Sequence, residues 1–230
     1  NTNSWITISS GGSGLGNGTV TYSVAANANS QARTGVLTIA GNAYTVSQAG
    51  VPCNYSLSAT AASFSAGGGN NKTVSITAAA SDCAWQTVNT NTWITINSGA
   101  SGFGNGSVSY TVSVNASSVA RSGVVTIAGI DYAVSQSGVT CTYALSSTNA
   151  SFSTGGGNGT VTINAAAADC AWQTTNTNAW ITIASGASGS GNGTVSYTVA
   201  ANTNSTARAG VVAIAGIDYA VSQSGVTCTY

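Results

Sequence analysis

Nearly the whole of this 230-residue chain consists of one sequence that returns with a long and almost constant period. The segment 119–143 recurs at 206–230 with three differences in 25 positions. Cys53, Cys141 and Cys228 are spaced by 88 and 87 residues. A repeat of that length is long enough to form one modest hydrophobic core of its own. The sequence therefore predicts small domains in series.

The phase of the repeat sets the expected domain boundaries. Residues 1–50 correspond to the C-terminal half of a repeat, 51–138 and 139–226 are complete repeats, and 227–230 begin the next one. Half a sandwich would expose an apolar face and unpaired strand edges. We therefore expect 1–50 to be completed by preceding residues of a longer chain or by strands of an adjacent subunit. Either way, the expected partners are neighbouring repeats or copies of the chain itself.

Charged side chains are scarce. The chain has four Lys or Arg, four Asp, no Glu and no His. Nucleic acids and anionic lipid surfaces are bound through dense Lys and Arg, so neither is expected as a partner. No apolar run is long enough to cross a membrane, and membrane insertion is not expected.

The same composition excludes most catalytic chemistry. Without His, the hydrolase triad is absent. A glycosidase pair would need Asp82 and Asp131 of one repeat to meet, but both are predicted turn residues. The glycine-rich segment 12–18 leads into a strand, so it lacks the helix N-terminus of a phosphate-binding loop. We expect no enzyme activity, no catalytic residue and no cofactor.

The cysteines recur as pairs. Cys53 and Cys83 lie in one complete repeat, Cys141 and Cys170 in the next, and Cys228 would pair with a residue beyond the sequence. Paired cysteines in small domains are typical of oxidising compartments, so we predict two disulfides and an extracellular or cell-surface location. Metal binding is the alternative, but two thiols and no His per repeat do not make a four-ligand site.

The apolar residues alternate with polar ones in short runs. Val108, Tyr110, Val112 and Val114 share one face of a predicted strand, as expected when one side of a sheet is buried. Short runs separated by Gly, Asn and Ser predict an all-β fold with two packed sheets in each repeat. We count residues 1–50 as the first repeat, 51–138 as the second and 139–226 as the third. The strands expected in the second repeat are 54–58, 62–66, 72–78, 84–88, 93–97, 106–115, 121–129 and 130–138.

The tryptophans occupy two kinds of position. Trp85 has the same strand parity as Cys83, so both should point into the core, with the indole packed on an inter-sheet disulfide. Trp93 lies on the face opposite Ile94, and Trp5 and Trp180 repeat that position. These three rings are candidate sugar platforms, or they cap the core and pack on the next repeat. We favour the structural interpretation, since Trp is seldom left exposed without a partner.

Several recurring motifs together resemble those of the BACON domains of bacterial surface and secreted proteins. They are a Cys at the start of the repeat, Cys-Ala-Trp, Trp-Ile-Thr-Ile followed by a glycine-rich loop, Ala-Arg-x-Gly-Val, and a closing Val-Ser-Gln. The resemblance covers essentially the whole chain and implies immunoglobulin-like sandwiches in a linear array. It also implies a proposed carbohydrate-binding role, or that of a spacer, and it brings no catalytic motif.

Asparagine sequons are dense. The position of Asn105 recurs at Asn17 and Asn192, where a plain Asn-Gly turn is the alternative to a glycan. Glycans would supply the hydration that charged side chains do not supply here. The candidate glycosylation sites are Asn17, Asn54, Asn71, Asn105, Asn115, Asn149, Asn158, Asn192 and Asn204.

These features favour an extracellular structural protein, a stalk, fibril or filament, that is glycosylated. Only residues 137–140 separate Gln136 of one repeat from Cys141 of the next, and so short a joint restricts the motion between domains. The alternatives are a multivalent carbohydrate-binding module, in which weak sites gain by avidity, and an adhesin arm on a bacterial surface. Glycans are partners in the first alternative.

Overall fold

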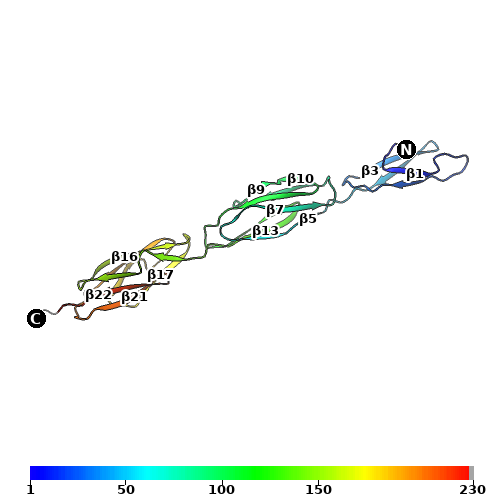
Figure 1. Ribbon diagram of the computed structural model, residues 1–230. Helices are drawn as coiled ribbons and strands as arrows, with labels where there is room; N and C mark the ends of the chain where they lie inside the picture. Colours follow the sequence, from blue (N-terminus) through cyan, green and yellow to red (C-terminus); the bar gives the residue numbers. More distant parts are fainter. Residues whose placement is uncertain (228–230) are drawn as a thin grey trace. The chain divides into compact units, whose positions relative to one another are not determined.

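The computed structural model describes residues 1–227, and regular structure within that range consists of strands alone (Figure 1). No helix in this range is long and apolar enough to span a membrane. The strands are β1 (Ile6–Ser10), β2 (Thr21–Val24), β3 (Arg33–Ile39), β4 (Asn42–Gln48), β5 (Tyr55–Leu57), β6 (Ala61–Phe64), β7 (Gly69–Ala78), β8 (Ala84–Asn89), β9 (Ile94–Ser98), β10 (Ser101–Phe103), β11 (Gly106–Val112), β12 (Arg121–Ile127), β13 (Ile130–Gln136), β14 (Tyr143–Leu145), β15 (Asn149–Phe152), β16 (Gly157–Ala165), β17 (Ala171–Asn176), β18 (Ile181–Ser185), β19 (Ser188–Ser190), β20 (Gly193–Val199), β21 (Arg208–Ile214) and β22 (Ile217–Gln223).

The chain forms two compact units whose limits do not follow the sequence repeat. Strands β1 to β13 lie in the first unit, except for one terminal residue each of β6, β12 and β13. The second unit contains β14 to β22 together with two loops of the second repeat. The first unit is Asn1–Ser63, Gly68–Ser113 and Ser122–Ser135, and the second is Phe64–Gly67, Val114–Arg121 and Gln136–Tyr230.

The second repeat contains two sheets, in the strand orders β5-β7-β11-β9 and β10-β8-β12-β13-β6. All eight strands predicted for it are present, which confirms the all-β assignment. A ninth strand, β10, was not predicted. Its residues, Ser101–Phe103, pair antiparallel with β8, yet they show no alternation of polar and apolar side chains and read as a glycine-rich loop.

The core of the second repeat follows the predicted alternation of β11 with one exception. Val108, Tyr110 and Val112 are buried, whereas Val114 is 65% exposed. The prediction that Val114 shares the buried face was therefore wrong. Strand β11 ends at Val112 because the chain then leaves the sheet to place the side chain of Asn115 in a buried loop.

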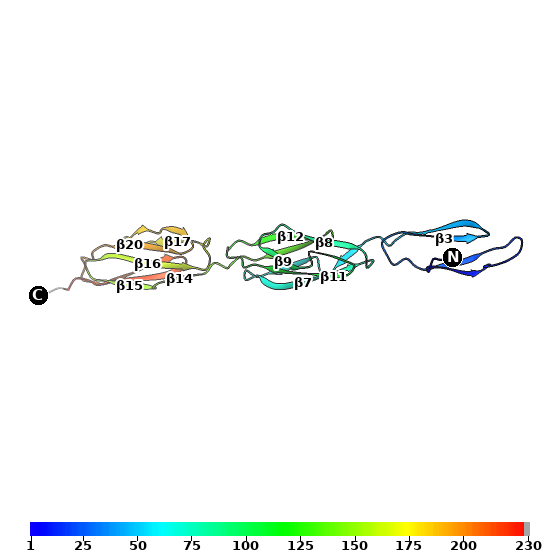
Figure 2. The same cartoon turned by 90° about the horizontal axis from the view of Figure 1, so that it is seen from above.

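The third repeat has the same architecture, in the orders β14-β16-β20-β18 and β15-β22-β21-β17-β19 (Figure 2). The first strand of its five-stranded sheet, β15, pairs parallel with the last strand of the repeat, β22, over Asn149–Phe152. The buried side chains between the sheets are Val161, Ile163, Trp172, Ile181, Val195, Tyr197, Val199, Val212, Ile214, Tyr219 and Val221.

Residues 1–50 contain only β1 paired with β2 and β3 paired with β4. Their core is small, with Ile6, Leu37 and Val46 as its buried members. Tyr44 keeps 48% of its surface exposed, whereas its counterpart in the second repeat, Tyr132, keeps 4%. The difference follows from the strands present, because β5 to β8 have no counterpart in residues 1–50.

Both predicted disulfides are present. Cys53 bonds to Cys83 and Cys141 bonds to Cys170, each with 5.4 Å between the Cα atoms. In each repeat the first cysteine lies before a strand of the four-stranded sheet and the second lies directly before a strand of the five-stranded sheet, so the bond joins the two sheets. Cys228 lies outside the described residues.

Candidate functional site

The tryptophans of the three Trp-Ile-Thr-Ile motifs are half-buried. The rings of Trp5 and Trp180 each lie under an arginine. The guanidinium carbon of Arg33 is 4.4 Å from the ring centroid of Trp5, and that of Arg208 is 4.5 Å from that of Trp180. These distances are in the range of a cation–π contact. One face of each of these two indoles is therefore covered, which supports the structural interpretation over the sugar platform. Trp93, the third of them, has the same partial burial.

The arginine at this repeat position also explains two of the recurring motifs, Ala-Arg-x-Gly-Val and the closing Val-Ser-Gln. The Nε of Arg208 donates to the side chain of Gln223 at 2.8 Å, and Arg121 makes the same bond to Gln136. Both glutamines are almost fully buried and donate in turn to backbone carbonyls. A buried amide is stable only when its polar atoms are paired, so Arg and Gln are required together.

A buried asparagine closes the loop between β11 and β12 of the second repeat and the equivalent loops of the other two. In the second repeat Asn115 donates from Nδ2 to the carbonyls of Val119, at 2.8 Å, and Ser137, at 3.1 Å. Asn27 and Asn202 make the equivalent pair of bonds. Because both amide hydrogens of Asn115 are used and its side chain is buried, a glycan cannot be attached there without opening the loop.

The chain leaves each repeat in contact with that loop. Val139 donates from its backbone N–H to the carbonyl of Ser117 at 2.8 Å. A side chain on Gly138 would place Cβ 2.0 Å from the carbonyl oxygen of Ser118, so only glycine fits at this position. The four-residue joint is therefore bonded to the preceding repeat from its first residues.

An aspartate of the following repeat binds the same loop. Asp169, in the second unit, accepts from the Ser117 hydroxyl at 2.6 Å and from the Ser118 N–H at 2.9 Å. Asp82, in the first unit, accepts from the N–H and the hydroxyl of Ser30 at 2.8 and 2.9 Å. We call each set of bonds a joint clasp. Asp82 was expected to be a turn residue, and its bond to the preceding repeat was not predicted.

These hydrogen bonds hold the carboxyl pKa values low. The backbone N–H of Ser30 is the largest cause at Asp82, and the hydroxyl of Ser117 is the largest at Asp169. A carboxyl whose pKa is lowered in the folded state stabilises the fold above its ordinary value of 3.8, and that contribution is lost as the pH falls through the lowered value. The joint clasps should therefore weaken only in acid.

We predict that the amide protons of Ser30 and Ser118 report this titration. Between about pH 6 and about pH 2 their NMR shifts should move with midpoints below 3.8, because the carboxylate that they contact becomes neutral. Asp169→Asn should remove the response at Ser118 and leave it at Ser30. Midpoints at or above 3.8 would show that these hydrogen bonds do not stabilise the carboxylate, and the absence of any response would show that the joint clasps do not exist in solution.

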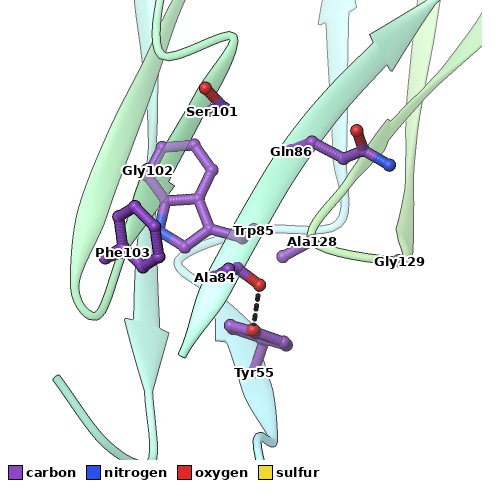
Figure 3. Close-up of a pocket in the computed structure, with 9 residues that line it drawn as sticks. All are labelled: Tyr55, Ala84, Trp85, Gln86, Ser101, Gly102, Phe103, Ala128 and Gly129. Atoms are coloured by element: carbon purple, nitrogen blue, oxygen red, sulfur yellow. Dashed lines mark hydrogen bonds between the residues drawn. The ribbon is translucent and has the colours of Figure 1, made fainter. Parts of the chain in front are cut away.

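The second repeat also has a shallow depression of about 470 Å³ between β5, β8 and β10 (Figure 3). Phe103 and Tyr55 border it, and the Tyr55 hydroxyl donates to the carbonyl of Ala84. Phe103 is 71% exposed. Its counterparts are Leu15 and Ser190, so the aromatic ring is not repeated. Sequence reasoning missed Phe103 because it lies in the unpredicted strand β10.

The sequons differ sharply in accessibility. The Oδ1 atoms of Asn105 and Asn192 each accept a backbone N–H at 2.9 Å, from Ala78 and Ala165, while the residues themselves are exposed. Asn115 is the buried exception. The exposed candidates are Asn17, Asn54, Asn71, Asn105, Asn149, Asn158, Asn192 and Asn204.

The acidic residues do not gather. Asp131 accepts from the hydroxyl of Thr126 in its own hairpin, whereas Asp82 binds Ser30 of the preceding repeat. Within residues 1–227 no group of three metal-ligating side chains lies together. The joint clasps and the Phe103 depression are two features of the described surface with a defined chemistry.

Comparison with known families agrees with this architecture. Residues 1–49 and 171–224 match the BACON model, described as "Putative binding domain, N-terminal". Residues 55–143 match the viral BACON domain. The repeats of this chain are BACON-type domains. The resemblance inferred from the motifs is confirmed, and the description of the matched BACON model names a binding domain and not an enzyme. No curated protein matches the chain.

Proposed function

We propose that this chain is an extracellular structural array, in which BACON repeats in series form a stalk, fibril or filament. The observation behind the proposal is that the same carboxylate–serine clasp recurs at both joints, at Asp82 and at Asp169. A four-residue joint that is hydrogen-bonded to the preceding repeat, beside a loop that binds an aspartate of the following repeat, restricts the rotation of one repeat against the next. Near-identical repeats that are coupled in this way make a protein long, and no repeat needs a binding site of its own.

The proposed location rests on the disulfides. Bonds such as Cys53–Cys83 persist in oxidising compartments and are rare in the cytosol. The near absence of charge fits a glycosylated surface, since an uncharged bare surface tends to associate.

NMR relaxation tests the array directly. In the 230-residue chain, amides of 51–138 and of 139–226 should share one rotational correlation time, because the joint clasp couples the repeats. Asp169→Asn should separate the two correlation times, with Asp218→Asn as a matched control that leaves them equal. Independent tumbling in the unsubstituted chain would refute the structural array.

A carbohydrate-binding or adhesin role is the second candidate, and the Phe103 depression favours it. An exposed aromatic ring beside a shallow depression is a suitable surface for stacking on a sugar. The third repeat has Ser190 at this position, so Phe103→Ser tests the site with a side chain that this fold already accepts. Binding on a glycan array that is lost in this variant would support the candidate, and no binding by the unsubstituted chain would eliminate it.

We predict glycans at Asn105 and Asn192 before the other sequons, because each is exposed at the end of a glycine-rich loop. Asn115 should be unmodified, since its amide is buried and doubly bonded. Glycopeptide mass spectrometry of native material checks both statements. An intact mass equal to that of the bare 22.4 kDa sequence would contradict the first.

A further inference from the structure

The loop between β20 and β21 of the third repeat, residues 202–206, has the same hydrogen bonds as the two loops that bind a carboxylate. Asn202 is buried and donates to the carbonyls of Thr206, at 2.9 Å, and Ser224, at 3.0 Å. Val226 donates to the carbonyl of Asn204 at 2.8 Å, as Val139 does to Ser117 in the second repeat. The third loop therefore has the framework that positions a joint clasp.

Ser205 is the counterpart of the two serines whose backbone N–H groups bind aspartate, Ser30 and Ser118. It is exposed, and within residues 1–227 no carboxylate accepts a hydrogen bond from it. The loop thus presents a backbone N–H and a hydroxyl side by side at the surface. Both groups are donors, which together suit an acceptor-only partner.

The residue that precedes the serine determines which groups donate to the carboxylate. Ser118 follows a serine, and the hydroxyl of that preceding residue, Ser117, also donates to the carboxylate. Ser30 instead follows an asparagine and contributes both its N–H and its own hydroxyl. Asn204–Ser205 repeats this second pattern, so Ser205 should bind with both of its donors.

We propose that the loop of residues 202–206 is a docking surface for the aspartate that precedes Cys-Ala-Trp in a further BACON repeat joined at the same short joint. The two observed clasps have their serine N–H and aspartate 52 and 51 residues apart, which fixes the place of the partner aspartate relative to Ser205. Asparagine does not replace it, because an amide would turn one acceptor atom into a donor facing a donor. This inference rests on the proposed structural array and adds the chemistry that continues it.

The test extends the chain after Thr227 with a second copy of residues 141–226. This places a copy of Asp169 at the spacing that separates Ser118 from Asp169, 51 residues. We expect hydrogen exchange at the Ser205 amide to slow by about tenfold or more relative to the 230-residue chain, and its proton shift to titrate in acid like that of Ser118. The matched control is the same extended chain with Asp169→Asn in the added copy only.

A second variant keeps the original chain length and tests the loop sequence itself. Ala116→Thr, Ser117→Asn and Val119→Thr convert the second loop to the sequence of the third. Asp169 should then still bind the Ser118 amide, in the pattern now seen at Ser30, and the acid titration of that amide should persist.

The outcomes separate this inference from the array. Exchange at Ser205 that is equally fast in the extended chain and its control overturns the inference, and so does loss of the Ser118 titration in the loop variant. If Ser30 and Ser118 keep their response, the array still stands. If neither of those amides titrates and the repeats tumble independently, both the array and the inference fail.

Discussion

Trp172→Ala is expected to destabilise the third repeat by about 3–5 kcal/mol, the cost of deleting a large buried aromatic ring. The indole is almost fully buried and lies where a Cβ on Gly189 or Gly193 would fall within 2.4 Å of it. Its Nε1 donates to the carbonyl of Gly191 at 2.8 Å. The substitution therefore opens a cavity and leaves a buried carbonyl without its donor.

Hydrogen exchange in increasing urea, resolved by peptide, measures this loss within one repeat, because tandem domains need not unfold together. Strands of the third repeat should open at lower urea while those of the second repeat are unchanged. Trp180→Ala is the matched control, with an expected loss of about 1–2 kcal/mol, since that ring is only half-buried. Equal losses for Trp172 and Trp180 would show that the core is not organised around the buried ring.

Removing the Cys141–Cys170 bond with paired alanine substitutions should cost the third repeat about 3–4 kcal/mol. The bond closes a loop with a sequence separation of 29 residues, which restricts the unfolded chain more than the folded one. A domain of about 87 residues has little stability to spare, so the variant should be largely unfolded near 50 °C while the second repeat stays folded.

The equivalent variant at Cys53 and Cys83 is the control, because it should reverse the pattern and destabilise the second repeat alone. Peptide-resolved hydrogen exchange distinguishes the two variants. Destabilisation of both repeats by either variant would mean that they fold as one cooperative unit. Unchanged stability would mean that the disulfides are not structural.

Much of the sandwich could be predicted from local patterns. Alternation located Val108, Tyr110 and Val112 on a buried face, and the shared parity of Cys83 and Trp85 placed both in the core. The pairing of cysteines followed from their recurrence in each complete repeat. These features are periodic or repeated, so a single sequence displays them.

The joint clasps could not be derived in the same way. Ser30 and Asp82 lie 52 residues apart in different repeats, and no local rule connects a turn serine with an aspartate at that distance. A signal was nevertheless present, because the four acidic residues of this nearly uncharged chain occupy only two repeat positions, Asp82 with Asp169 and Asp131 with Asp218. Strand β10 was missed for another reason. Its middle residue is Gly102, where a Cβ would lie 2.4 Å from the ring of Trp85, and a glycine gives no alternation of polar and apolar side chains.

The placement of the disulfides limits how far each complete repeat can lengthen under tension. A pull along the chain enters the third repeat at Cys141 and passes through the sulfur–sulfur bond to Cys170. The intervening residues, which include β14, β15 and β16, lie in a covalently closed loop. They withhold roughly 100 Å of contour length, at about 3.5 Å for each extended residue. While the cysteines stay oxidised, an unfolded repeat can extend to only about two thirds of the contour length of the reduced chain.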